Sequence, residues 1–195
     1  MAVPAPDDLP IEEFASAADF EKWLAAQPES AAGIWLKIAR KKTGIDSLDY
    51  AQALDVALCY GWIDGQKRSA DETYWLQRFT PRGPTSKWSQ VNRQHAERLI
   101  TKHRMRPAGQ AEIDRAKADG RWAAAYPSQK TAEVPDDLRK ALDNDPEARE
   151  FFATLDSRNR YSVLYRIGDA KKPETRAARI QKYVAMLHEH QKIHS

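Results

Sequence analysis

The chain has 195 residues, of which 42% are hydrophobic and 30% are charged, and its formal net charge is +3. This composition excludes an intrinsically disordered chain, and no apolar run approaches the ~20 residues needed to span a bilayer. The single cysteine, Cys59, excludes an internal disulfide. Residues 1–10 contain two aspartates, three prolines and no basic residue, so they predict no secretory signal and we expect a cytoplasmic protein.

Charge alternates along the chain in blocks. The net charge is −5 over residues 1–60, +6 over 61–110, −3 over 111–150 and +5 over 151–195. Such blocks are typical of surfaces on which opposite charges pair within the molecule, and also of a face that binds an anion. The pattern leaves both interpretations open.

The first part of the chain predicts two helices separated by a strand. A first helix begins after Ser16, which can cap it, and ends before Pro28. Over residues 33–41 a half-exposed strand is predicted, because one face would carry Ile34, Leu36 and Ile38 and the other Trp35, Lys37 and Ala39. A second helix follows Ser47 as its cap and ends at Gly61.

Two further strands are predicted at 62–68 and 73–80, joined by a turn at residues 69–72. The length of this turn predicts two cross-strand pairs on one face of the hairpin, Trp62 with Phe79 and Gln66 with Trp75. The opposite face would carry Ile63, Lys67, Tyr74, Leu76 and Arg78. Pro81 ends this sheet, because proline cannot donate to a ladder.

The remainder of the chain predicts helices. Ser86 would cap a helix that carries Trp88, and further helices are predicted at 107–119, 135–143, 146–154, 158–168 and 174–190. We therefore predict an α+β fold in which residues 1–120 form a small sheet of about three strands with flanking helices. Residues 121–134 would form a linker, and residues 135–195 a helical C-terminal lobe.

The sequence contains none of the common catalytic motifs. It contains no glycine-rich phosphate loop, nucleophile elbow, paired-histidine zinc helix or paired cysteines. Cys59 follows apolar residues of a helix, which predicts a buried structural thiol rather than a nucleophile. His188 and His190 do not share a helical face, so we expect no metal site. We expect no cofactor and name no catalytic residue, and an enzyme is the less favoured class.

Aromatic and basic residues gather between residues 60 and 93. Arginine pairs with phosphate or carboxylate in bidentate geometry, and aromatic rings stack on bases or sugars. The predicted binding residues are Trp62, Asp64, Gln66, Lys67, Arg68, Trp75, Arg78, Arg82, Trp88 and Arg93. They predict a non-enzymatic protein that binds nucleic acid or another anionic ligand. Alternatively, the aromatic rings fill the core and the cations pair with the acidic blocks.

Two other functions stay open. Trp62, Asp64, Gln66 and Trp75 would line the pocket of a small-molecule enzyme, with a desolvated Asp64 as general base. Without that role, Asp64 and Gly65 form a turn or bulge. The helical lobe would instead dock a protein partner, which predicts a large exposed apolar patch on it. The sequence predicts no oligomeric state.

The last predicted helix has an apolar stripe and a basic edge. Ile180, Val184 and Leu187 make the stripe, and the edge consists of Arg176, Arg179 and Lys182. These cations either help to dock the lobe or form a second contact for an anion.

Several segments resemble a known family. They are residues 57–68 (ALCYGWIDGQKR), 77–82 (QRFTPR), 104–109 (RMRPAG), 134–135, 151–155, 170–176 (AKKPETR) and 179–180. They are similar to the YdeI/OmpD-associated, or bacteriocin-protection, family. The resemblance implies association with an outer-membrane porin and tolerance of antibacterial peptides, and it implies no reaction. The N-terminal part is also similar to the YjbR/CyaY-like superfamily of small α+β domains, for which a winged, DNA-binding role has been proposed.

Overall fold

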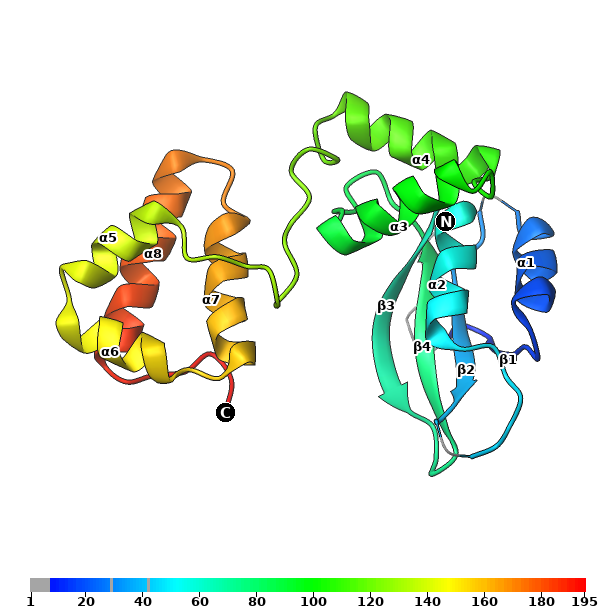
Figure 1. The fold of residues 1–195 in the computed structure, drawn as a ribbon, viewed down its shortest axis with the longest axis horizontal. Helices are drawn as coiled ribbons and strands as arrows, with labels where there is room; N and C mark the ends of the chain where they lie inside the picture. The colour runs from blue at the N-terminus through cyan, green and yellow to red at the C-terminus, as the bar shows by residue number, and fades with distance from the viewer. Residues whose placement is uncertain (1–7, 29, 42) are drawn as a thin grey trace. The chain divides into compact units, whose positions relative to one another are not determined.

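The structure, a computed structural model, describes residues 8–28, 30–41 and 43–195 and has the predicted α+β fold (Figure 1). The chain divides into two compact units. One consists of residues up to 88 together with 92–125, and the other of residues 89–91 together with 126–195. Each unit has its own hydrophobic core, so the two are described separately.

A four-stranded sheet organises the N-terminal unit. Its strands lie in the order β1 (Ile11–Glu13), β2 (Ile34–Ala39), β4 (Tyr74–Pro81) and β3 (Trp62–Ser69). β1 is parallel to β2, and the other two pairings are antiparallel. The sequence predicted about three strands. β1 has three exposed residues, which is too short for an alternating pattern to reveal it.

The helices of this unit are α1 (Ala17–Ala25), α2 (Tyr50–Cys59), α4 (Pro107–Ala118) and most of α3 (Gln90–Thr101). Ser16 caps α1 as predicted, since its Oγ accepts from the backbone N–H of Asp19. Two other predicted caps are wrong. Asp49, not Ser47, caps α2 through a capping box, and α3 begins after Trp88, so Ser86 does not cap it.

The two faces of the sheet are covered differently. One face carries Ile34, Leu36 and Phe79, which are buried in the main core together with side chains of α1 and α2. The opposite face carries a separate small cluster of Leu9, Trp35 and Leu76. The sheet thus has one face under helices and one face with only a small apolar cluster.

β3 changes its register against β4 partway along the hairpin. Three pairs precede the irregularity and three follow it: Trp62–Pro81, Ile63–Thr80, Asp64–Phe79, Lys67–Gln77, Arg68–Leu76 and Ser69–Trp75. The predicted pairs of Trp62 with Phe79 and of Gln66 with Trp75 are therefore wrong. The predicted placement of Lys67 on the face away from Trp75 is wrong as well, because the irregularity shifts the alternation of side chains.

A buried glutamine holds the bulge that causes this shift. Gln77 is 4% exposed, and its Nε2 donates to the carbonyl oxygens of Gly65 at 2.9 Å and Gln66 at 3.2 Å. Carbonyl groups in a bulge lack ladder partners, so a donor beneath them stabilises the bulge. The bulge brings Lys67 and Ser69 to the side of β3 on which Trp75 lies.

The C-terminal unit is a cluster of four helices, α5 (Asp136–Asp143), α6 (Pro146–Thr154), α7 (Ser157–Gly168) and α8 (Pro173–His188) (Figure 1). Each predicted helix end lies within two residues of the observed one. All four helices contribute to one core, which includes Leu138, Phe152, Ile167 and Leu187. Residues 121–134 consist mainly of turns and irregular backbone.

Three observations bear on chemistry. In the part of the chain that the structure describes, no helix has both the length and the apolar character to cross a membrane. The described residues also contain no group of three or more His, Cys, Asp or Glu side chains arranged to hold a metal ion. Cys59 is buried as predicted, and burial raises the pKa of its thiol to about 11, which keeps the sulfur protonated and unreactive.

Candidate functional site

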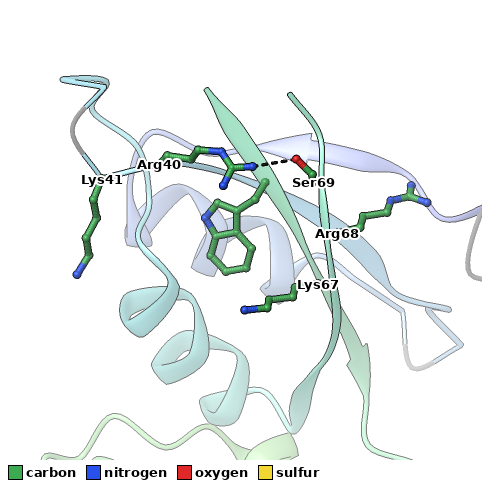
Figure 2. A pocket seen from close by; sticks show the side chains of 6 residues that line it. Arg40, Lys41, Lys67, Arg68 and Ser69 are labelled. Atoms are coloured by element: carbon green, nitrogen blue, oxygen red, sulfur yellow. Dashed lines mark hydrogen bonds between the residues drawn. The ribbon is translucent and has the colours of Figure 1, made fainter. Parts of the chain in front are cut away.

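A pocket of about 470 Å³ lies at the end of the sheet where β2 and β3 finish and β4 begins (Figure 2). The described residues that line it are Arg40, Lys41, Lys67, Arg68, Ser69 and Trp75. Four of these six side chains are cations and none is a carboxylate, so the pocket favours an anion. We call these six residues the basic pocket.

Pairing of strands that are distant in sequence assembles the basic pocket. Arg40 and Lys41 directly follow β2, and the backbone N–H of Arg40 donates to the carbonyl oxygen of Thr73 at 2.8 Å. This bond places both cations beside the start of β4. The pairing of Ser69 with Trp75 brings the end of β3 to the same place. The pocket therefore depends on the sheet topology rather than on any one segment.

Arg40 is the fixed cation of the pocket. Its Nη2 donates to Oγ of Ser69 at 2.9 Å (Figure 2) and also to the carbonyl oxygen of Asp71 at 3.2 Å. The Asp71 carboxylate accepts from the backbone N–H groups of Tyr74 and Thr73, and these bonds lower its pKa. The β3–β4 turn and the guanidinium thus hold one another in place.

Lys41 and Lys67 supply exposed positive charge. Among the residues that the structure describes, neither lysine forms an ion pair, and both are exposed. Lys67 and Arg68 extend from β3 in opposite directions (Figure 2). The guanidinium of Arg68 lies 4.3 Å from the ring centroid of Trp35, which belongs to the other face of the sheet. The two lysines are the cations best placed to meet a ligand.

Trp75 provides an aromatic wall next to these cations. Its half-buried ring packs on the main core and lies 6.1 Å from the ring of Tyr50, the first residue of α2. The Tyr50 hydroxyl donates to Oδ2 of Asp64 at 2.9 Å. Burial and this carboxylate together raise the pKa of Tyr50 well above 10. An aromatic ring held beside lysines can stack on a base or sugar while the lysines contact phosphate.

The structure brings three of the ten predicted binding residues, Lys67, Arg68 and Trp75, into the basic pocket. Gln66 is exposed in the bulge. Asp64 is half-buried and accepts the hydrogen bond from Tyr50. Arg78 pairs across the strands with Trp35, on the face away from the core.

The remaining four predicted residues lie at the other end of the sheet, in the segment between β4 and α3, or on α3. Trp62 and Arg82 are each 5% exposed. The guanidinium of Arg82 lies 3.5 Å from the ring centroid of the buried Trp88. Nη1 of Arg93 donates to the carbonyl oxygen of Trp122 at 3.4 Å. At these positions the rings pack in the interior, as the alternative interpretation expected.

A single pocket that contains both Trp62 and Trp75 does not form among the described residues. Trp62 pairs with Pro81 at the beginning of β3, whereas Trp75 pairs with Ser69 at its end. Ser69 lies seven residues after Trp62 in β3, which corresponds to about 23 Å. These residues therefore do not form the pocket that the alternative enzyme hypothesis predicted.

Sequence reasoning missed three residues of the basic pocket, Arg40, Lys41 and Ser69. The first 60 residues have a net charge of −5, and averaging over them hid a local excess of cations. Four of the five basic residues in that block lie between 37 and 42. A basic run at the end of a predicted strand was the signal that could have identified Arg40 and Lys41.

The structure also bears on the predicted docking lobe. The large hydrophobic side chains that are exposed among the described residues are Ile11, Ile45, Tyr50 and Val91. None of them lies in residues 135–195, all of which the structure describes. The apolar patch expected for a protein-docking lobe is therefore not found there.

Two family models match the chain. Residues 12–112 match the model described as a domain of unknown function (DUF8412), and residues 131–190 match the one described as "Bacteriocin-protection, YdeI or OmpD-Associated". The second match confirms the resemblance for residues 131–190. The N-terminal segments at 57–68, 77–82 and 104–109 fall instead within the range of the first model, which shows no YjbR/CyaY-like relationship. No curated protein and no solved structure matches the chain.

Proposed function

We propose that this protein, which belongs to the family described as the domain of unknown function DUF8412, binds an anionic ligand at the basic pocket, with nucleic acid as the first candidate. One observation carries the proposal. Four of the six described residues that line the pocket with Trp75 are cations, and none of them is a carboxylate. The function is recognition, with no chemical conversion of the ligand.

The combination of lysines and an aromatic wall favours a single strand. Lysine contacts phosphate as a point charge, and a tryptophan face stacks on an unpaired base. In a duplex the bases stack on one another and do not reach such a ring. The volume of about 470 Å³ lies in the range of ligand sites and suits one nucleotide with its phosphate.

The biological setting is part of the same proposal. The model that matches residues 131–190 is named for bacteriocin protection, so we place the protein in tolerance of stress or antimicrobial peptides, acting in the cytoplasm.

The test is a titration followed by tryptophan fluorescence. Short single- and double-stranded DNA and RNA are added at low and at near-physiological salt. We expect quenching that weakens as salt rises, with single strands bound more tightly than duplexes. Lys41→Ala and Lys67→Ala should each reduce the slope of log affinity against log salt by about 1. Trp75→Leu should remove most of the quenching.

Matched variants distinguish the basic pocket from general positive charge. Lys22→Ala, at an exposed lysine of α1, should bind like the unaltered protein. Arg78→Ala and Arg93→Ala should also bind normally, because neither residue lines the pocket, whereas Arg68→Ala should weaken binding. An absence of response at low salt, or equal losses in Lys22→Ala and Lys67→Ala, would refute the proposal.

A further inference from the structure

A second cavity, of about 600 Å³, lies at the opposite end of the sheet, where β3 begins and β4 ends. Its walls come from both strands, from the end of α1 and from one side of α4. We call it the α4 cavity, and the residues that matter below are Tyr60, Trp62, Arg82, Arg106, Ala111 and Glu112. It shares no described lining residue with the basic pocket.

Three segments quoted in the sequence analysis meet at this cavity. They contribute Tyr60–Trp62, Pro81 with Arg82, and Arg106–Ala108. The segments are distant in sequence, so the sheet and the packing of α4 on α2 must both form before they converge. The nucleic-acid proposal uses none of these residues.

Two glycines let the helices approach closely enough to build the wall. Gly61 has φ +76°, and a Cβ there would lie 2.9 Å from Cγ of Glu112 and 3.0 Å from the carbonyl oxygen of Ala108. At Gly109 a Cβ would collide with the carbonyl oxygen of Cys59. The end of α2 therefore lies directly against the first turns of α4, and Glu112 is held at the cavity.

Glu112 has one carboxylate oxygen without a donor. The residue is 8% exposed, and its Oε1 accepts from Nη2 of Arg115. Its Oε2 is buried and has no hydrogen-bond partner among the described residues. A buried carboxylate oxygen without a donor is unfavourable, so an N–H group of a ligand would stabilise it once the Glu112 side chain turns toward the cavity.

Guanidinium groups line the same cavity. Arg106 is half-exposed, with a side-chain exposure of 51%, and its Nη2 lies 2.6 Å from Oε1 of Glu21. Arg82 is buried against Trp88. Cations therefore exceed carboxylates in the lining, and a ligand with a cationic group alone would meet repulsion. The complementary ligand carries both an N–H cation and an anion.

We propose that the α4 cavity binds a small zwitterion, an amino acid or short peptide with free ends. The ammonium group of the ligand donates to Oε2 of Glu112, and its carboxylate pairs with Arg106. The part of the ligand between these two groups packs along Trp62 and Pro107. The volume of about 600 Å³ exceeds that of one small amino acid, so short peptides are the better size.

The experiment uses the full chain and a set of related probes. Glycine, diglycine and triglycine carry the same charged ends at increasing separation, and binding is measured by saturation-transfer NMR and calorimetry. We expect one of these lengths to bind best. N-acetyldiglycine lacks the ammonium group and diglycinamide lacks the carboxylate, so each should bind at least tenfold more weakly than diglycine.

Variants locate the binding in the α4 cavity. Ala111→Phe fills the cavity from an exposed position of α4 and should weaken binding at least tenfold, whereas Ala118→Phe, at the end of the same helix, should not. Glu112→Gln should weaken binding of the zwitterion as much as Ala111→Phe does. The proposal is wrong if no oligoglycine binds, if N-acetyldiglycine binds as well as diglycine, or if Ala111→Phe binds normally. Each of these results leaves the nucleic-acid titration unaffected.

Discussion

Two basic regions of the molecule contain the same kinds of side chain and use them differently. In the basic pocket, Lys41 and Lys67 form no ion pair among the described residues. On α8, Arg176 lies 2.5 Å from Oδ2 of Asp137 through its Nε and 2.9 Å from Oδ1 through its Nη2. It also donates to the carbonyl oxygen of Ile167 at 3.2 Å. The α8 arginine joins helices, whereas the pocket lysines face solvent.

Carboxylates near the basic pocket are occupied by other donors, and this explains the difference. Asp71 accepts backbone N–H groups of its own turn, and Asp64 accepts the hydroxyl of Tyr50. On α8, Asp137 is oriented toward Arg176, and Asp169 lies 3.8 Å from Arg179. A count of cations in sequence therefore does not identify a binding surface. What decides whether cations form a binding surface is whether the nearby carboxylates pair with them or accept hydrogen bonds from other donors.

The largest effect should come from loosening the bulge of β3. Gln77→Leu removes the donor to the carbonyl oxygens of Gly65 and Gln66, which costs about 1–3 kcal/mol of unfolding free energy. The position of Lys67 beside Trp75 should loosen as well, and oligonucleotide affinity should fall severalfold. Urea unfolding and the fluorescence titration measure the two losses.

The exposed neighbour Gln66 gives the matched control for this change. Its side chain is exposed in the bulge, so Gln66→Leu should change stability and binding little. If Gln77→Leu lowered stability but left oligonucleotide affinity intact, the bulge would not be what positions the pocket.

A smaller effect is expected on α8, and on stability alone. Arg176→Ala removes the charged hydrogen bonds to Asp137 and should lower the unfolding free energy by about 1.5 kcal/mol. Lys182→Ala, at an exposed residue of the same helix, should have almost no effect. Neither variant should change nucleic-acid binding. Weaker binding by Arg176→Ala would instead mean that α8 contributes to the anion site.

The smallest effect is a pH dependence at the end of α8. Nδ1 of His188 lies 3.0 Å from Oδ1 of Asp145, the residue that caps α6, and this hydrogen bond raises the pKa of His188 above 6.5. The stabilisation is fully present below 6.5 and is lost as pH rises through the raised folded-state pKa.

Asp145 sets the acid limit of the same interaction. The backbone N–H of Ala148, and then His188, lower the pKa of Asp145 below 3.8, so its contribution is lost as pH falls through that lowered value. Urea unfolding between about pH 5.5 and about pH 8.5 should show stability declining with pH, and His188→Gln should flatten the decline. An unchanged decline in that variant would assign the pH dependence to another group.

Local patterns were sufficient for most of the fold. Apolar spacing gave the helices of the C-terminal unit. In the structure, Asp145 and Asp156, which were not predicted as caps, cap α6 and α7 through their side chains. Alternation gave β2, but the expected exposure of its outer face is wrong at Trp35, which is buried with Leu9 and Leu76. The cap at Ser47 was mistaken because Asp49, two residues later, satisfies the same rule and also has Gln52 as its capping-box partner.

The candidate site was harder to predict because long-range pairing forms it. Arg40 meets Ser69 only because β2 lies beside β4, an arrangement that alternation within one strand does not encode. A turn or bulge at Asp64 and Gly65 was one of the alternatives from the sequence, and the structure has a bulge there. The shift of register was not predicted, because the glutamine that stabilises the bulge, Gln77, lies on the neighbouring strand.

The bulge has a consequence for insertions and deletions. Between Asp64 and Lys67, β3 advances three residues while β4 advances two, from Phe79 to Gln77, so the bulge accommodates one extra residue. Removing Gly65 or Gln66 would restore regular alternation and leave Lys67 opposite Gln77, on the side of Trp75. A strand of unchanged length without the bulge would instead turn Lys67 to the other face and bring Arg68 toward Trp75. When such proteins are aligned, the number of residues between Asp64 and Lys67 therefore has to be read together with the presence of Gln77, and both are better markers of the site than charge.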